Sequence, residues 1–356
     1  MNLLRTAIAA ALLSVAGAAN AQLQWNLTYT AGTTAAAQAN FIAATNYWSS
    51  VFSDNITVNL TVGLASLGTG VLGSTGSTRA FVDYADYRSA LAADAKSAND
   101  QKAVSSLGGG STFDMLLNRT ANNPNGAGSA TTYLDNNGND NNRTVSLTTA
   151  NAKAAGFTLD PSVTSDGSVR FATGFLSSFD FDRSDGIGAN QFDFLGIAIH
   201  EIGHALGFIS GVDILDINST GTFFDDSEFT YVAPLDLFRY SAASTAQGVI
   251  DWSASTTDKY FSLDKGVTKI ASFSTGRTWG DGQQNSHWKD SLGLGIMDPT
   301  AARGELLSVT DLDKTAFDVI GWDVTTPVPE PSTYAMLGLG LAAVGFMRRR
   351  KAAAAK

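Results

Sequence analysis

The stretch HEIGHALGF, residues 200–208, places two histidines four positions apart with a glutamate directly after the first. Residues four apart lie on one face of a helix, so His200 and His204 can present two imidazole nitrogens to one metal ion. Glu201 is rotated by about 100° from His200 and can sit beside that ion without ligating it. There it could accept a proton from water, which is the general-base role in zinc hydrolases.

These residue types are scarce, which makes the pattern specific. The whole chain of 356 residues contains three histidines and four glutamates. A buried amphipathic helix with two core histidines is the alternative interpretation, but such a helix does not need a glutamate at position 201. We expect the helix to span about 190–207, with Asn190 as its N-cap and Gly207 ending it in a left-handed conformation.

A catalytic zinc ion usually has three protein ligands, so the two histidines require a third. Ser210 stands at the spacing of the tightest zincin pattern and is a poor zinc ligand. Asp213 lies slightly beyond it, and Glu228 has a spacing compatible with zincins that use a later glutamate. His287 is the remaining histidine of the chain. Spacing alone leaves the last three residues as candidates.

The surroundings of His287 carry a resemblance to a known family. The sequence reads Ser286-His287-Trp288, and ten residues after His287 comes Met297-Asp298-Pro299. Together with residues 200–208, this order resembles the leishmanolysin branch of the metzincin metalloproteases over about residues 160–324. The resemblance implies that His287 is the third zinc ligand and that Met297 forms the Met-turn beneath the metal. The chain departs from that branch in having no cysteine.

The resemblance also implies a fold class, α/β (α+β), of the metzincin-like zincin type. We expect a mixed twisted sheet and the active-site helix in an N-terminal lobe, residues 22–210. An irregular C-terminal lobe, residues 211–324, would carry the third ligand and the Met-turn. Periodicity predicts the following elements: helices at 35–52 and 82–105, a strand at 55–64, an edge strand at 167–175 and a β-hairpin at 260–273.

Two segments could bind calcium through side-chain oxygens. The carboxylates of Asp180, Asp182 and Asp185 are closely spaced and are followed by glycine, although the twelfth-position acid of an EF-hand loop is missing. The segment 122–142 is rich in asparagine and glycine and predicts a surface loop, with calcium binding as its alternative role.

The N-terminus predicts export. Residues 1–21 contain Arg5, an apolar stretch at 7–15, and Ala19-Asn20-Ala21 before Gln22. This arrangement is typical of a cleaved signal peptide, and the apolar stretch is too short for a transmembrane helix.

The C-terminal segment, residues 325–356, has three parts: a proline-rich linker, an apolar run at 334–347 and a basic cluster at 348–351. Its Val328-Pro329-Glu330-Pro331 sequence and its order resemble a PEP-CTERM sorting tail. The resemblance implies recognition and removal by an exosortase-type enzyme in a Gram-negative bacterium that makes exopolysaccharide. A plain C-terminal anchor is the alternative.

The charge balance restricts the partners. Residues 22–329 contain 17 basic and 32 acidic side chains, a formal charge of −15. Such a charge disfavours nucleic acids and anionic membranes as partners. Without cysteine, the chain uses neither disulfides nor thiolate ligands.

The sequence therefore predicts a secreted or cell-surface zinc-dependent endopeptidase, with Glu201 as general base. Its cofactor would be zinc, with calcium as a further candidate, and its partners a protein or peptide substrate and the sorting enzyme. No stable membrane domain is expected after processing. The alternative is a non-catalytic zinc-binding, adhesin-like protein of the exopolysaccharide layer, but such a protein would not need Glu201.

Overall fold

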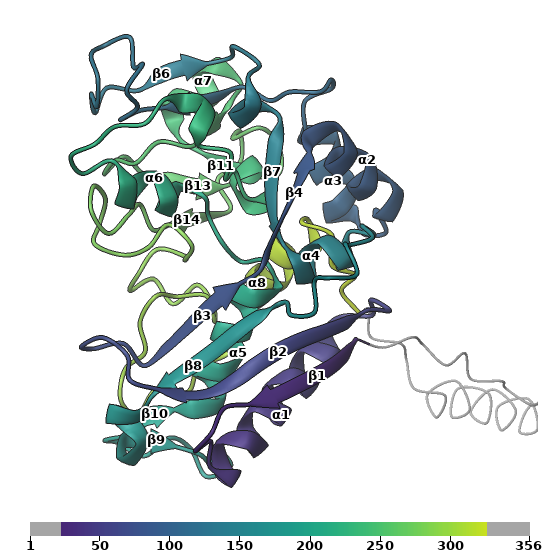
Figure 1. The fold of residues 1–356 in the computed structure, drawn as a ribbon, viewed down its shortest axis with the longest axis vertical. Coiled ribbons are helices and arrows are strands. Elements are labelled where there is room, and N and C mark those ends of the chain that lie inside the picture. Colours follow the sequence, from purple (N-terminus) through teal and green to yellow (C-terminus); the bar gives the residue numbers. More distant parts are fainter. Residues whose placement is uncertain (1–22, 326–356) are drawn as a thin grey trace, which may run out of the picture. The chain divides into compact units, whose positions relative to one another are not determined.

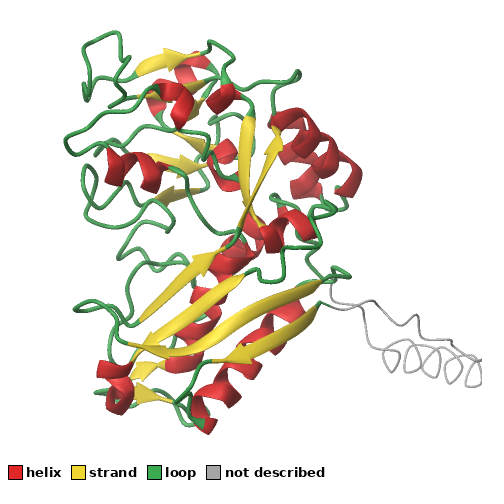
Figure 2. Ribbon diagram, viewed as in Figure 1, coloured by secondary structure: helices red, strands yellow, loops and turns green. Residues whose placement is uncertain are grey.

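The computed structural model describes residues 23–325. The predicted signal peptide and sorting tail lie outside these residues, apart from the first position of the tail. The chain divides into one compact unit that ends at Asp323 and a second that begins at Val324. The description below concerns the first unit, drawn in Figures 1 and 2.

Helices and strands alternate irregularly along this unit. The helices are α1 (Ala35–Val51), α2 (Tyr84–Asp94), α3 (Ala98–Ser106), α4 (Thr149–Ala154), α5 (Phe194–Leu206), α6 (Val212–Asn218), α7 (Ala242–Gln247) and α8 (Asp311–Asp318). Short 3-10 helices are η1 (Asp140–Asn142), η2 (Thr173–Ser178), η3 (Asp226–Glu228) and η4 (Pro234–Phe238). The strands are β1 (Gln24–Tyr29), β2 (Thr57–Ala65), β3 (Gly73–Ser77), β4 (Arg79–Asp83), β5 (Met115–Leu117), β6 (Tyr133–Asp135), β7 (Thr144–Thr148), β8 (Gly167–Ala172), β9 (Phe179–Asp180), β10 (Phe192–Asp193), β11 (Arg239–Tyr240), β12 (Ile250–Asp251), β13 (Lys259–Phe261) and β14 (Ala271–Phe273).

The largest sheet has four strands in the order β1-β2-β8-β3 (Figure 1). Strands β1, β2 and β8 run parallel, and β3 pairs antiparallel with β8, with Thr75 opposite Val169. The strand predicted at 167–175 was expected at the edge of the sheet, and this prediction is wrong. β8 has a partner on each side, because the segment 73–77 forms a further strand that takes the edge position.

Helices α1 and α5 pack against this sheet and against each other (Figure 1). Phe41 of α1, Phe171 of β8 and Phe194 of α5 form one aromatic cluster, in which the rings of Phe171 and Phe194 are stacked 4.1 Å apart. The indole of Trp48 donates a hydrogen bond to the carbonyl of Ile199, at 3.1 Å. Helix α5 is therefore tied to both the sheet and α1 along its buried side.

The ends of α5 are defined by local chemistry. Its N-cap is Asp193, which accepts a hydrogen bond from the amide of Gly196 at 2.9 Å, so the prediction of Asn190 as the cap is wrong. Asp193 also accepts from the amide of Leu307 and pairs with Arg183 at 3.2 Å. Gly207 ends the helix, as predicted, with φ +121°. A buried cap that binds two amides and one guanidinium fixes the start of the helix more firmly than an exposed asparagine would.

Two other predicted elements differ in detail. The helix predicted at 82–105 is two helices, because Ser97 stops α2 from continuing and caps α3 with its hydroxyl. The predicted hairpin at 260–273 is confirmed, since β13 and β14 pair antiparallel. A further three-stranded sheet, β12-β5-β6, joins residues before and after position 210. The division into two lobes at residue 210 stays a prediction.

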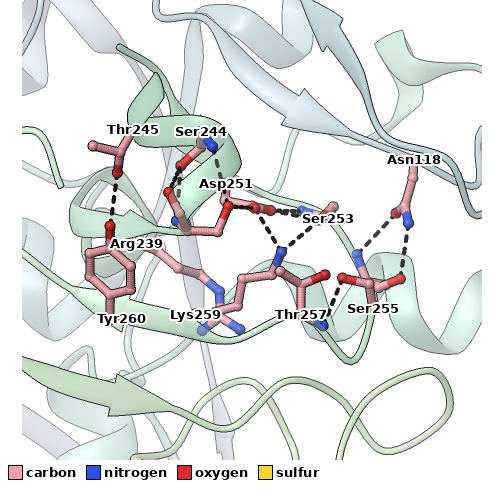
Figure 3. Close-up of polar contacts among 12 residues, drawn as sticks. Asn118, Arg239, Ser244, Thr245, Asp251, Ser253, Ser255, Thr257, Lys259 and Tyr260 are labelled. Atoms are coloured by element: carbon pink, nitrogen blue, oxygen red, sulfur yellow. Dashed lines mark hydrogen bonds and ion pairs between the residues drawn. The ribbon is translucent and has the colours of Figure 1, made fainter. Parts of the chain in front are cut away.

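A buried ion pair lies among the strands of the C-terminal half (Figure 3). Lys259 Nζ is 2.7 Å from a carboxylate oxygen of Asp251 and 2.9 Å from the hydroxyl of Ser253. Both charged side chains are about 1% exposed. Removing one partner alone would leave an unpaired buried charge, which typically costs about 3–5 kcal/mol. The pair therefore requires β12 and β13 to keep one relative position.

No helix among the described residues combines the length and the apolar character needed to cross a bilayer.

Candidate metal centre

Three histidines from two distant segments converge at one point. His200 and His204 lie on α5, and His287 comes from the loop that follows β14. The Nε2 atom of His204 is 3.1 Å from that of His200 and 3.1 Å from that of His287. The remaining separation, between His200 and His287, is 3.4 Å. The structure thus brings together the three residues that the sequence predicted as ligands.

The other ring nitrogens reveal the tautomers. Nδ1 of His200 is 2.7 Å from the carbonyl oxygen of Ile296, and Nδ1 of His204 is 2.7 Å from that of Phe208. A carbonyl oxygen only accepts, so both Nδ1 atoms carry the proton and donate. Each Nε2 then directs a lone pair at the others. Nδ1 of His287 faces the carbonyl oxygen of Gln284 at 3.4 Å, which favours the same tautomer there. Three Nε2 lone pairs that face one another at such distances repel unless a cation lies between them.

The geometry fits zinc. Three nitrogens that surround one zinc ion tetrahedrally, at about 2.0–2.1 Å, lie about 3.3 Å apart from one another. The observed separations of 3.1–3.4 Å bracket this value. Among the residues described, the three histidines form a cluster of at least three potential ligand side chains. The carbonyls that orient His200 and His204 take the place that carboxylates often have around zinc-bound histidines.

Burial keeps the imidazoles neutral. It lowers the pKa of His204 to about 3, with the charge of His200 as the second cause. The pKa of His287, which is 6% exposed, is lowered well below its ordinary value by burial and by the other two histidines. Neutral imidazole is the form that binds metals, so these two residues need not lose a proton to do so at neutral pH.

Glu201 lies against the edge strand β3. The hydroxyl of Thr75 donates to Glu201 Oε2 at 2.7 Å and also contacts the Glu201 carbonyl at 2.8 Å. A Cβ placed on Gly73 would come within 2.6 Å of Glu201 Oε1, so only glycine leaves room for the carboxylate there. Burial raises the pKa of Glu201, and the charge of His200 and the Thr75 hydrogen bond lower it in part. A raised pKa suits a carboxylate that must take up a proton.

Met297 packs against α5 at Gly203. A Cβ placed on Gly203, between His200 and His204, would lie 2.7 Å from the Met297 sulfur, so the glycine permits close contact. Asp313 of α8 accepts hydrogen bonds from the amides of Ile296 and Met297, at 2.9 and 3.4 Å. The buried carboxylate therefore positions the turn whose carbonyl orients His200.

The other candidates for a third ligand have different partners. Asp213 accepts from the amide of Asn285 at 2.7 Å and from the hydroxyl of Ser286, and so supports the loop that carries His287. The Ser210 hydroxyl donates to Asp236 at 2.6 Å. Glu228 ends the short helix η3 and does not belong to the histidine cluster. The convergence of His287 with the α5 histidines favours it over all three.

The predicted calcium ligands at 180–185 do not form a comparable cluster. Asp180 accepts hydrogen bonds from the amides of Asp182 and Gly188, at 3.0 and 2.9 Å, and Asp182 accepts from Ser184 at 3.1 Å. Asp182 and Asp185 are exposed. The carboxylates of Asp180 and Asp182 thus accept hydrogen bonds from backbone amides of their own loop.

A cleft of about 710 Å³ opens over the three histidines. Its lining includes Gly73, Thr75 and Ser77 of β3 together with Glu201 and the three histidines. The sequence did not predict β3, because its residues, GSTGS, are typical of a loop. Nor did it predict Asp313, since an aspartate in the first turn of a helix is ordinary.

Comparison with known proteins identifies the C-terminal tail. Residues 327–351 match the PEP-CTERM protein-sorting motif. This motif is recognised by exosortase and marks an exported protein that is sorted to the cell surface, so the predicted sorting tail and the predicted export to the surface are confirmed. No curated protein matches the chain. No solved structure matches it.

Proposed function

We propose that the chain is a zinc-dependent endopeptidase of the exported, surface-sorted class, with a metzincin-like fold related to the leishmanolysin branch. The observation that carries this proposal is the convergence of three Nε2 atoms within 3.1–3.4 Å of one another in a cleft that Glu201 also lines. His200, His204 and His287 would hold the ion.

The ion, when bound, would supply Lewis acidity toward a peptide carbonyl and lower the pKa of water. The rest of the chemistry falls to the chain. Glu201 accepts the proton from the attacking water and delivers it to the leaving amine. Thr75 keeps the carboxylate oriented through its 2.7 Å hydrogen bond. The imidazoles bring no negative charge of their own, so the positive charge at the site stays undiminished.

Strand β3 supports a peptide as the substrate. It is an edge strand, and its residues line the cleft beside Glu201. An extended peptide could pair with such an edge through main-chain hydrogen bonds. Main-chain pairing is largely independent of side chains, so we expect cleavage of unfolded proteins of varied sequence.

The proposal is tested with the purified full-length protein and denatured casein. We expect cleavage, its complete loss after treatment with 1,10-phenanthroline, and its return on addition of zinc. Zinc analysis of the same sample should give one ion per chain. A protein that holds one zinc per chain but cleaves no member of a panel of denatured proteins would instead support the non-catalytic surface protein.

Replacing Thr75 with valine tests whether the Thr75 hydroxyl orients Glu201 as the general base. Valine keeps the shape but not the hydrogen bond, and hydrogen bonds to charged groups are worth about 1.5–3 kcal/mol, so kcat/KM should fall about ten-fold or more. Because the Thr75 hydroxyl lowers the pKa of Glu201, its loss raises that pKa further. Glu201 acts as a base only above its pKa, so the acidic limb of the pH–rate profile should move to higher pH. Thr75→Ser, which keeps the hydroxyl, serves as the control, and an unmoved limb in Thr75→Val would contradict the assigned role.

A further inference from the structure

A second group of side-chain oxygens, far from the histidines in sequence, lies between the loop 135–142 and η3. Asp135 ends β6, and Asn137, Asn139 and Asn141 follow at alternate positions. Asp226, from η3, completes the group. Side chains at alternate loop positions, led by aspartate and continued by asparagine, match the first part of a common calcium-binding pattern.

Hydrogen bonds join these five residues in two sets, and the packing of η1 against η3 brings the sets side by side. Nδ2 of Asn139 donates to Asp226 Oδ1 at 2.9 Å, and Nδ2 of Asn137 lies 3.3 Å from Asp226 Oδ2. Nδ2 of Asn141 donates to Asp135 Oδ2 at 2.8 Å. Asn141 lies in η1 and Asp226 in η3, so the contact between these two short helices joins the two sets.

Several oxygens of the group are buried without a hydrogen-bond partner. They are Oδ1 of Asp135, Oδ1 of Asn139 and Oδ1 of Asn141. Asp135 is 2% exposed and Asn141 is fully buried. A buried polar atom without a partner costs roughly 1–3 kcal/mol, and three in one loop are unusual. Since all three atoms accept and none donates, the partner they lack is a cation or a donor.

The charges also point to a cation. Asp226 is 3% exposed, and neither it nor Asp135 forms an ion pair with any residue that the structure describes. Arg143, the nearest basic residue in the sequence, donates to the Gly138 carbonyl instead. Two buried carboxylates without a counter-charge are destabilising, and one divalent cation balances both.

We propose that Asp135, Asn137, Asn139, Asn141 and Asp226 form a calcium-binding site. Carboxylate and amide oxygens are the ligands that calcium prefers, and it takes six to eight of them, the remainder coming from backbone carbonyls and water. An asparagine amide can turn by 180° and present Oδ1 in place of Nδ2 with little change in shape, so the amides that contact Asp226 can also contribute oxygens. With two carboxylates, we expect a Kd on the order of 10⁻⁴ M, as in extracellular modules.

The test is calcium titration of the purified full-length protein after removal of divalent ions with EGTA and restoration of zinc. We expect one calcium per chain by calorimetry. At about a hundred times the Kd, calcium should raise Tm by about 5 °C, and magnesium at the same concentration should raise it much less. Asp226→Asn and Asp135→Asn should weaken binding at least ten-fold, which reduces the Tm shift to about half or less at the same calcium concentration.

Asn137→Ala serves as the folding control, because Asn137 is exposed and its replacement should not disturb the fold. It should bind calcium more weakly with an unchanged Tm in EGTA. Asp180→Asn, a matched change in the other aspartate-rich turn, should bind like the wild type, and all variants should retain one zinc per chain. An absent calcium shift in the wild type, an equal magnesium shift, or a calcium shift of wild-type size in Asp226→Asn would overturn the assignment.

Discussion

Replacing Glu201 with glutamine is expected to reduce proteolysis by about 10²–10⁴-fold while the zinc content stays at one ion per chain, because a general base contributes about that factor. Glutamine has the same shape and can still accept the Thr75 hydrogen bond, which is 2.7 Å in the wild type. It cannot take up a proton at neutral pH. Casein hydrolysis and zinc analysis on the same preparation separate the loss of the base from the loss of the metal.

The control for this variant is Glu228→Gln. It makes the same chemical change at a glutamate that lies outside the histidine cluster, and it should leave both activity and zinc content unchanged. If Glu201→Gln cleaved casein at the wild-type rate, the base would have to be another residue. If Glu201→Gln lost its zinc, Glu201 would have to be a metal ligand. That result would contradict the contact of the Glu201 carboxylate with strand β3.

The second large effect is expected for His287→Ala. Even the outer partners of zinc ligands contribute about 10–100-fold to metal affinity, so loss of a ligand should weaken zinc binding by more than about 100-fold. A competition titration against a zinc-binding dye measures the change. The variant should keep its helical circular dichroism, because His287 lies in a loop and not within a helix.

Asp213→Ala tests whether Asp213 binds the metal or only positions the loop that carries His287. Asp213 contacts Asn285 and Ser286 rather than the other histidines, so its loss should weaken zinc binding by only about 10–100-fold. The structure thus predicts a smaller loss for Asp213→Ala than for His287→Ala. The reverse order would make Asp213 the third ligand, which the spacing in the sequence left open.

The sequence predicted the parts of the site that depend on local spacing. The positions of His200, Glu201 and His204 on one helix follow from its period, and Gly207 was correctly expected to end it. The approach of His287 could not be derived from spacing, because His287 lies 83 positions after His204, and only a resemblance suggested it.

Residues that act through tertiary contacts were missed. Strand β3 has a loop-like composition and forms because β8 offers it a partner. Thr75 and Gly73 therefore could not be predicted as site residues. The cap at Asp193 was missed for a similar reason, since its contacts with Arg183 and Leu307 are distant in sequence. The asparagine-rich segment 122–142 was expected to be a surface loop, whereas Asn141 and Asn142 are fully buried.

The distance in sequence between His204 and His287 also sets an order of events during folding. Two imidazoles can face one another as soon as α5 forms, but the third arrives only when a loop of 83 residues has closed, which is a slow step. The orientation of His200 depends on Ile296, which Asp313 positions from still further along the chain. A partly synthesised or partly folded chain therefore has an incomplete site. Any chemistry that needs all three histidines therefore begins only when almost the whole unit has folded.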